Sequence, residues 1–266
     1  MSEQYLHGHH PSVLASHTWR TAANSAAYLL EYLEAEMDVL DVGCGVGTIT
    51  VDLATYVPQG RVLGIDRALP PLERAADLAV AQNVENVEFE QANAYALPFA
   101  DGSFDVVHAH QLLQHLRDPL AAIREMKRVL RRGGLLALRE ADYGGMTWFP
   151  ESGLTGWRDL YQQLSDRHGR HAQAGRRVLA WVRAAGFTAV QPSASTWCFA
   201  EPDEREYWSH MWAERMTHSR LAELALETGL ADQAELDRIV AAWHEWGEDE
   251  SGWFTVVHGE VLARGN

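Results

Sequence analysis

The stretch from residue 37 to residue 66 constrains the fold of this 266-residue chain more than any other. It opens with a short apolar run, Val39–Val42, that contains one carboxylate. Such a run is typical of a strand buried inside a parallel sheet. Three glycines follow at alternate positions, Gly43, Gly45 and Gly47. A loop with so little side-chain bulk lets a ligand approach the backbone closely, so we expect a binding loop here.

A helix and a second strand follow this glycine loop. Residues 48–56 carry apolar side chains at helical spacing, and residues 61–65 form an apolar run that ends in Asp66. The loop therefore lies between a strand end and a helix N-terminus, where free N–H groups attract polar or anionic ligand groups. Asp66 lies 19 residues after Gly47, near the ~20 expected for an acid that accepts hydrogen bonds from ribose hydroxyls.

Two common nucleotide-binding patterns do not fit this loop. The dinucleotide fingerprint has a third glycine where this chain has Thr48, which disfavours a nicotinamide-dependent dehydrogenase. The acid that precedes the glycines, Asp41, is also foreign to that fingerprint. The sequence has no Gly-Lys-Ser/Thr motif, so it lacks the lysine of a phosphate-binding loop.

The run Leu40-Asp41-Val42-Gly43-Cys44-Gly45-Val46-Gly47, with Asp66 at its spacing, resembles the first motif of the class I S-adenosylmethionine-dependent methyltransferases. The resemblance extends to about residue 140, and Arg128–Gly134 is similar to the family's turn into its fifth strand. It implies an α/β fold with a Rossmann-like seven-stranded sheet, mostly parallel with an antiparallel last strand, and helices on both faces. It also implies S-adenosyl-L-methionine as the cofactor.

The resemblance further implies which residues hold the cofactor. Asp66 takes the ribose hydroxyls, and Asn93 with Ala94 takes the adenine, although the family usually has an aspartate where this chain has Asn93. The asparagine carbonyl still accepts a hydrogen bond from the adenine amino group. The expected cofactor-binding residues are Arg20, Asp41, Gly43, Cys44, Gly45, Gly47, Asp66, Arg67, Asn93, Ala94, His110 and Gln111.

Other apolar runs predict the rest of the sheet and its helices. Strands are expected at residues 87–91, 104–109, 135–138, 187–199 and 253–262. Helices are expected at residues 70–81, 154–167 and 175–185, and a further helix begins at Asp118-Pro119 and ends at residues 131–134. Because ligands bind at the carboxyl ends of parallel strands, His110 is the histidine expected to contact the cofactor.

The N-terminal tract is polar and rich in histidine, and it leads into a helix expected from about residue 13 to residue 33. Residues 5–22 read Tyr-x-His-Gly-His-His-x-Ser-Val-Leu-x-Ser-His-x-Trp-Arg-Thr-Ala. This tract resembles the N-terminal signature of a group of actinobacterial small-molecule methyltransferases, which includes enzymes that methylate indole rings in tryptophan-derived natural products. No Asp, Glu or Cys stands at ligand spacing from His9, His10 and His17, so polar surface or pocket lining is favoured over a metal site.

The pattern divides the chain into five consecutive parts. These are an N-terminal cap segment and helix (1–36), a cofactor-binding core (37–150), the completion of the core (151–202), a helical lid insertion (203–250) and the final strand (251–266). Two helices are expected in the lid, between residues 203 and about 248. Its Trp and Met residues at helical spacing are either plain core or the wall of a pocket for a flat substrate, and the sequence leaves both open.

Methyl transfer from a sulfonium needs no covalent enzyme intermediate, but some acceptors must lose a proton to a base. The segment from Glu140 to residue 149 leaves the fifth strand where the substrate is expected. The candidate catalytic residues are Tyr5, His9, His17, His110 and Asp142, with Glu140 as a further candidate base. The expected substrate is an aromatic small molecule, first an indole in a tryptophan-containing diketopiperazine. A quinone ring carbon, another N- or O-acceptor, and a cofactor-binding sensor or partner subunit are the alternatives.

Composition limits the setting in which the chain acts. A formal net charge of −15 argues against nucleic acid as a partner, because phosphates would be repelled. No apolar run approaches the ~18 residues of a membrane span, and the N-terminus lacks the order of a signal peptide. Two cysteines are too few for a disulfide framework, and Cys44 is expected to be a small packing residue of the glycine loop. These features predict a cytoplasmic protein.

Overall fold

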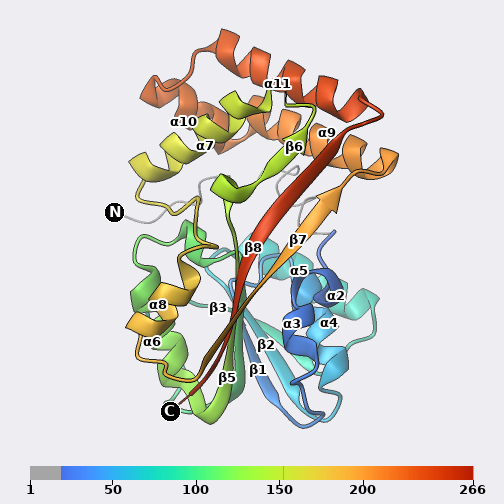
Figure 1. Ribbon diagram of the computed structural model, residues 1–266. Helices are drawn as coiled ribbons and strands as arrows, with labels where there is room; N and C mark the ends of the chain where they lie inside the picture. Colours follow the sequence, from blue (N-terminus) through green and yellow to red (C-terminus); the bar gives the residue numbers. More distant parts are fainter. Residues whose placement is uncertain (1–18, 152, 266) are drawn as a thin grey trace.

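The computed structural model describes residues 19–151 and 153–265. One sheet with helices on both faces carries a helical layer above the carboxyl ends of its parallel strands (Figure 1). The strands are β1 (Asp38–Val42), β2 (Arg61–Asp66), β3 (Val87–Gln91), β4 (Phe104–His110), β5 (Leu130–Ala141), β6 (Thr147–Phe149), β7 (Val190–Phe199) and β8 (Trp253–Arg264).

The strand order is β3-β2-β1-β4-β5-β8-β6, with β7 paired to β8. The pairs among β1, β2, β3, β4 and β5 are parallel, whereas β8 runs antiparallel to β5 and β7. The predicted Rossmann-like sheet with an antiparallel last strand is therefore confirmed. The expected number of seven strands is wrong, because β6 makes an eighth within the described residues. Since β7 pairs along one edge of residues 254–255 of β8, the short strand β6 pairs along the other edge, beyond the end of β5.

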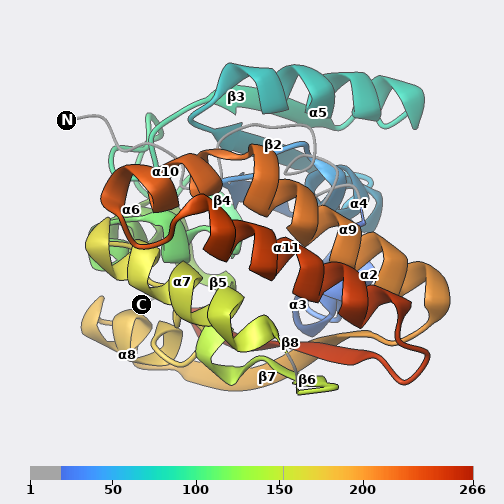
Figure 2. The same cartoon turned by 90° about the horizontal axis from the view of Figure 1, so that it is seen from above.

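Helices flank the sheet and cap it (Figures 1 and 2). The helices are α2 (Ala22–Ser25), α3 (Ala27–Leu30), α4 (Thr48–Tyr56), α5 (Leu69–Ala81), α6 (Pro119–Val129), α7 (Leu154–Arg167), α8 (Val178–Ala184), α9 (Pro202–His218), α10 (Arg220–Thr228) and α11 (Gln233–Glu248), with 3-10 turns η1 (Leu113–His115) and η2 (Tyr143–Gly145). No helix of the described ranges is long and apolar enough to cross a bilayer.

Alternating side chains of the central strands fill two separate cores. Val39 of β1 and Val106 of β4 pack with α2, α3 and α4 on one face of the sheet. Leu40 and Val107, one position further along, pack with α6 and α8 on the other face. Because successive strand residues point to opposite faces, a continuous apolar run buries both faces of the sheet.

The N-terminal helix is not continuous, contrary to expectation. Residues 13–18 of its predicted span lie outside the described residues, and the rest forms the short helices α2 and α3 with a break at Ala26 (φ −135°). In one continuous helix the carbonyl of Asn24 would accept from the amide of Tyr28. Instead it accepts from the indole Nε1 of Trp197 on β7, at 2.7 Å. A bond to a distant strand therefore replaces a local helical bond.

Two further boundaries differ from the prediction. Helix α6 ends at Val129, and residues 131–134, expected to close that helix, already belong to the extended strand β5. Three helices, α9, α10 and α11, occupy the segment expected to hold two. Ser219 makes the extra break, because it is extended (φ −95°, ψ 166°) and its side chain caps the amide of Leu221 at the start of α10.

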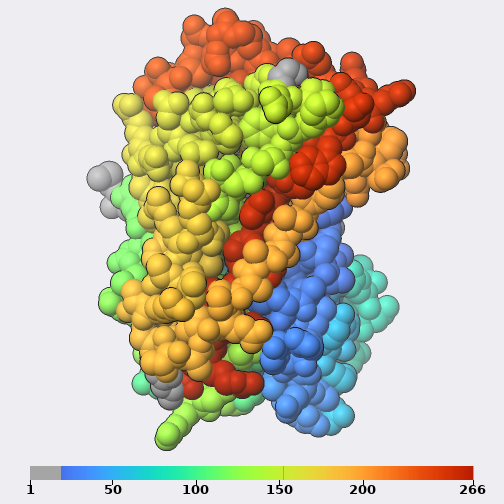
Figure 3. All heavy atoms as spheres, in the orientation of Figure 1, coloured from blue at the N-terminus to red at the C-terminus, as the bar shows by residue number. Residues whose placement is uncertain are grey.

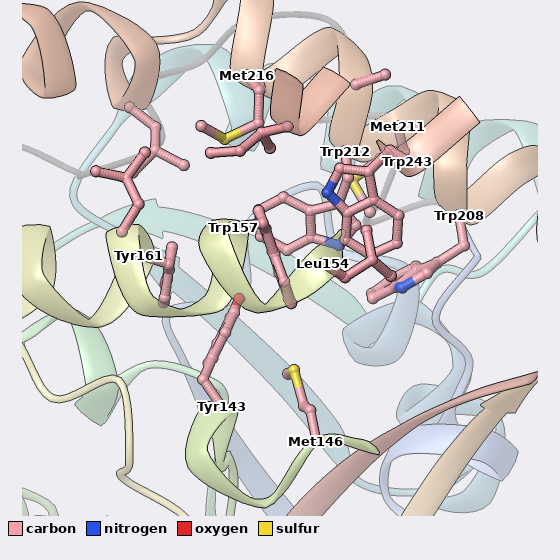
Figure 4. Close-up of a cluster of buried hydrophobic side chains, with 14 of the residues drawn as sticks. Tyr143, Met146, Leu154, Trp157, Tyr161, Trp208, Met211, Trp212, Met216 and Trp243 are labelled. Atoms are coloured by element: carbon pink, nitrogen blue, oxygen red, sulfur yellow. The ribbon is translucent and has the colours of Figure 1, made fainter. Parts of the chain in front are cut away.

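The tryptophans of the helical layer pack against one another (Figure 4). The ring of Trp157 on α7 lies 4.6 Å from that of Trp212 on α9 and 4.9 Å from that of Trp243 on α11, measured between centroids. All three side chains are fully buried. They form the core of the layer, so for these residues the packing interpretation holds and the substrate-wall interpretation does not.

Gly47 gives a first prediction about stability. It adopts φ +77°, and a Cβ there would lie 2.6 Å from the Cβ of Ala75 on α5. We expect Gly47→Ala to lower the free energy of unfolding by about 2–4 kcal/mol, the left-handed strain and the steric overlap together. Urea denaturation measures this loss.

Gly133 provides the matched control for that variant. It adopts φ +80°, and an added Cβ would meet nothing within 4 Å. Gly133→Ala should therefore cost only the backbone strain, about 1–2 kcal/mol. Equal losses for the two variants would show that the contact with Ala75 contributes nothing.

Candidate active site

A pocket of about 660 Å³ lies at the carboxyl ends of the central parallel strands. Eleven of the twelve predicted cofactor-binding residues line it, namely Arg20, Asp41, Gly43, Cys44, Gly45, Asp66, Arg67, Asn93, Ala94, His110 and Gln111. Gly47 is not in the lining, because its position faces Ala75 and Phe89 instead. The structure thus gathers residues from five separate segments into one cavity.

The strand order gives the pocket a direction. Asn93 follows β3, Asp66 ends β2, Gly43 follows β1 and His110 ends β4, and these strands are neighbours in that order. With about 4.8 Å between adjacent strands, the line from Asn93 to His110 spans about 14 Å. A ligand with adenine over β3 and ribose over β2 would therefore extend its other end toward β4.

Hydrogen bonds tie the glycine loop to the end of β2 and to Asp66. The amides of Gly43 and Cys44 donate to the carbonyl of Ile65 at 2.7 and 3.0 Å. Asp66 accepts from the amide of Gly45 at 3.1 Å and from that of Ala68 at 2.9 Å. Gly43, Gly45 and Gly47 have φ values of +78°, +57° and +77°. This left-handed backbone explains the alternate glycines.

Asp41 lines the pocket and also makes hydrogen bonds inside the protein. Its carboxylate accepts from the hydroxyl of Thr50 at 2.6 Å and lies 2.7 Å from Nδ1 of His108, which is fully buried. Asp41 and His108 are paired in the register of β1 and β4. These bonds lock β1, β4 and α4 together beneath the loop, so His108 points at Asp41 and is absent from the pocket lining.

Asn93 lines the pocket beside the end of β3, where the adenine is expected. Its side-chain carbonyl accepts from the amide of Tyr95 at 3.1 Å, a turn that asparagine commonly makes. A carbonyl oxygen has two lone pairs, so it can take a second hydrogen bond from a ligand.

Cys44 lies next to Asp41 and Asp66, and burial, followed by their charges, raises the pKa of its thiol well above the ordinary value. Cys44 is therefore protonated and not a nucleophile.

His110 is the group on the pocket wall with the most unused capacity for hydrogen bonds. The side chain is 6% exposed, and neither ring nitrogen has a hydrogen-bond partner among the described residues. Burial, followed by the charges of Arg139 and Arg20, lowers the pKa of His110 well below its ordinary value. His110 is therefore neutral at physiological pH and has one nitrogen able to accept a proton.

A polar chain borders His110. The guanidinium of Arg20 donates to the side-chain oxygen of Gln111 at 3.0 Å, and the amide nitrogen of Gln111 lies 2.8 Å from Nε2 of His258. Sequence reasoning missed His258, since its approach to the end of β4 depends on the pairing of β8 with β5. Its signal was a histidine in the middle of a mainly apolar final strand.

Two acids named as candidate catalytic groups are not in the described pocket lining. Asp142 accepts from the guanidinium of Arg176 at 2.6 and 2.7 Å and from the amide of Gly145 at 3.0 Å. Glu140 accepts from the amides of residues 112, 113 and 114 and is fully buried. Both acids therefore hold loops in place. Tyr5, His9 and His17 lie outside the described residues.

His115 and Arg170 also line the pocket, although the sequence pattern singled out neither as a site residue. The guanidinium of Arg170 donates to the carbonyl of His115. Burial, followed by the charge of Arg170, lowers the pKa of His115 to about 3, so its ring is neutral.

Glu140 makes stability depend on pH in an unusual direction. Burial raises the pKa of Glu140 to about 8, although three backbone amides oppose that shift. The folded chain then holds a proton that the unfolded chain has lost above its ordinary value of about 4.5. The contribution of Glu140 to stability should therefore fall as pH rises from about 5 to about 8.

The variant Glu140→Gln isolates this effect, because glutamine does not titrate. The difference in unfolding free energy, wild type minus variant, should move against the wild type between pH 5 and pH 8. Urea denaturation at several pH values measures it. A constant difference would mean that Glu140 is ionised throughout, with the three amides prevailing over burial.

Known proteins resemble this chain in sequence and in fold. Residues 33–186 match the model of a methyltransferase domain family. An uncharacterized methyltransferase of Schizosaccharomyces pombe is 35% identical over 98% of this chain and 96% of its own length. A demethylmenaquinone methyltransferase of Lactococcus lactis is 40% identical over a shorter stretch, 40% of this chain and 43% of that protein.

A solved structure shares the fold at low sequence identity. It is a phosphoethanolamine N-methyltransferase 2 of Haemonchus contortus in complex with phosphomonomethylethanolamine and S-adenosylhomocysteine. The match has a TM-score of 0.57 and 19% identity, and it covers 90% of this chain and 52% of that one. The pocket fits such a cofactor, since Asp66 and Asn93 supply acceptors at one end and a neutral His110 with Arg20 stands at the other. This chain belongs to the class I S-adenosylmethionine-dependent methyltransferases, and S-adenosylmethionine is its cofactor.

Proposed function

We propose that this methyltransferase acts on a ring carbon of a small aromatic molecule, with the indole of a tryptophan-containing diketopiperazine as the first candidate. The observation that carries the proposal is His110, a buried neutral imidazole on the pocket wall. The bound cofactor supplies a methyl group that is already activated on its sulfonium. The residues of the chain hold the acceptor, exclude water and take up one proton.

A base with a lowered pKa suits a ring carbon better than a hydroxyl. A phenol has an ordinary pKa of about 10, so a weakly basic imidazole is a poor acceptor for its proton. Methylation of an indole carbon instead gives an iminium, which an internal amide nitrogen attacks. As the new carbon–nitrogen bond forms, the amide proton becomes strongly acidic and passes to His110. The lowered pKa of His110 therefore favours carbon methylation over O-methylation.

Aromatic side chains pack behind His110. The ring of Trp197 lies 5.6 Å from that of His110, and Trp19 packs against Trp197 at 5.0 Å. Neither tryptophan lines the described pocket, so they act by fixing the orientation of the His110 ring at the pocket wall through edge and face contacts. The acidic charge of the chain supports a small molecule and not a nucleic acid as substrate, and a cytoplasmic location is part of the proposal.

Carbon methylation of a quinone-type ring is the second candidate. The local similarity to a demethylmenaquinone methyltransferase favours it. A quinol carbon that gains a methyl group also carries an acidic proton, so the argument from His110 applies equally. Tyr5, His9 and His17 stay candidate catalytic residues.

Incubation with labelled S-adenosylmethionine and separate acceptor panels tests the proposal. The panels are indole diketopiperazines, quinols, phenols and amines, and mass spectrometry detects the added methyl group. Product from the indole panel supports the first candidate, and product from the quinol panel supports the second. Methylation of phenol oxygens or amines alone would overturn the assignment to a ring carbon.

A further inference from the structure

The contacts of Gln111 fix the direction of every hydrogen bond in the chain from Arg20 to His258. A guanidinium only donates, so the atom of Gln111 that lies 3.0 Å from Arg20 is the carbonyl oxygen. The other end of the same amide is then an NH₂ group, and it donates to Nε2 of His258 at 2.8 Å. His258 must therefore accept at Nε2.

This direction assigns the proton of the His258 ring. A neutral imidazole that accepts at Nε2 carries its hydrogen on Nδ1. Burial, followed by the charges of Arg139 and Arg20, lowers the pKa of His258 well below its ordinary value, so the ring is neutral. A doubly protonated ring would place an N–H against the NH₂ group of Gln111 and break the chain.

The left-handed backbone of Gln111 indicates that the surrounding structure holds this side chain in place. Gln111 adopts φ +50°, one of two left-handed residues other than glycine in the described chain. Such a conformation is strained and persists where the surroundings demand it. Here it directs the Gln111 side chain across the end of β4 to meet Arg20 and His258 together. His258 itself is fully buried and sits against Trp197, with 4.4 Å between ring centroids.

We propose that His258 is a positioning residue of the cofactor site. It orients the Gln111 amide, and Gln111 in turn holds the Arg20 guanidinium at the β4 end of the pocket, where a guanidinium suits the carboxylate of the cofactor. The inference rests on the assignment of Arg20 to the cofactor, but it is independent of the acceptor that is methylated. His258 is not in the described lining of the pocket, so it acts through Gln111 and not by contact with the ligand.

Two amide variants of His258 separate this role from simple packing. A glutamine side chain places its oxygen about where Nε2 of histidine lies, whereas an asparagine side chain reaches only as far as Nδ1. We expect His258→Asn to weaken the binding of S-adenosylhomocysteine by about tenfold and His258→Gln to remain within about threefold of wild type. Isothermal titration calorimetry measures both, and thermal unfolding confirms that each variant is folded. Equal affinities for the two variants would overturn the proposal.

A double-mutant cycle with Arg20→Gln tests whether His258 acts through Arg20. If it does, adding His258→Asn to Arg20→Gln causes no further loss of affinity. Fully additive losses would overturn the proposal, and so would an unchanged affinity in Arg20→Gln alone. All these measurements use the product cofactor without an acceptor. Failure of the acceptor panels would therefore refute the proposed function and leave this test intact.

Nitrogen-15 NMR of the imidazole rings gives a readout that a packing role would not move. Wild-type His258 should show a protonated Nδ1 and a bare Nε2 across the physiological range of pH. Gln111→Glu places a carboxylate beside Nε2, and the His258 ring should then gain a proton there. A wild-type ring protonated at Nε2 would contradict the assigned direction of the chain.

Discussion

Replacing Asp66 with alanine is expected to weaken the binding of S-adenosylhomocysteine by about 100-fold, or about 2.7 kcal/mol. Two losses add in this variant. The ligand loses a charged acceptor for its ribose hydroxyls, and such hydrogen bonds contribute about 1.5–3 kcal/mol. The glycine loop also loses the bond from the Gly45 amide at 3.1 Å, so part of its ordering must be supplied when the ligand binds. Calorimetric titration with S-adenosylhomocysteine measures the change.

Two further variants make this result specific. Asp66→Asn keeps one acceptor but turns an NH₂ group toward either the Gly45 or the Ala68 amide, and an intermediate loss of about tenfold is expected. Asp101 is an exposed acid, paired with Arg128 on the surface, and Asp101→Asn should leave the affinity unchanged. If Asp66→Ala bound the ligand within about threefold of wild type, the assignment of Asp66 to the ribose would be wrong.

Local sequence patterns predicted which residues of the glycine loop and of β2 gather at the pocket. The glycine loop and Asp66 depend on backbone conformation and on the end of a strand, both of which the sequence expresses within about thirty residues. Asp66 accepts a hydrogen bond from the amide of Gly45 in the glycine loop. Gly43 and Gly45 have the left-handed backbone that glycine favours. Short-range patterns of this kind survive folding because no distant contact competes with them.

The features that the sequence did not predict depend on contacts between residues far apart in the chain. The break at Ala26 follows from a bond between Asn24 and Trp197, which are 173 positions apart in the chain. His258 reaches the end of β4 because β8 crosses beside β5 and brings residues 258–260 next to residues 139–141. Neither pairing has a local signature, since a strand's partner and register are set by the whole sheet.

Asp142 shows that a distant contact can also make a predicted catalytic residue a structural one. Asp142 was a reasonable catalytic candidate, as it follows the active end of β5 among glycines and aromatic residues. Its carboxylate instead holds Arg176, which belongs to the segment before α8, and no local pattern announced that arginine as its partner. In the space-filling view, the segments after residue 150 and the last strand cover the upper and central parts of this side of the molecule, and the blue N-terminal segments form its lower right (Figure 3).

His110→Gln is expected to lower kcat by about 10²- to 10³-fold on the acceptor that the panels identify, the usual contribution of a positioned general base. Glutamine keeps a hydrogen-bonding group near the ring position but cannot take up a proton. The affinity for S-adenosylhomocysteine should change by less than about tenfold, because the ribose and adenine contacts stay intact. Single-turnover rates and calorimetric titration separate the two effects.

The pH profile of the wild-type enzyme gives the sharper test of His110. Because burial and the charges of Arg139 and Arg20 lower its pKa, the neutral, proton-accepting form persists well below the ordinary histidine value of 6.5. The rate should therefore stay constant as pH falls through 6.5 and decline only at lower pH, and His110→Gln should abolish that decline. His244 on α11 is exposed, and His244→Gln serves as the control that keeps both the rate and its profile. A wild-type rate that halves near pH 6.5 would assign the proton transfer to a different, less perturbed group, with His9 and His17 as the next residues to replace.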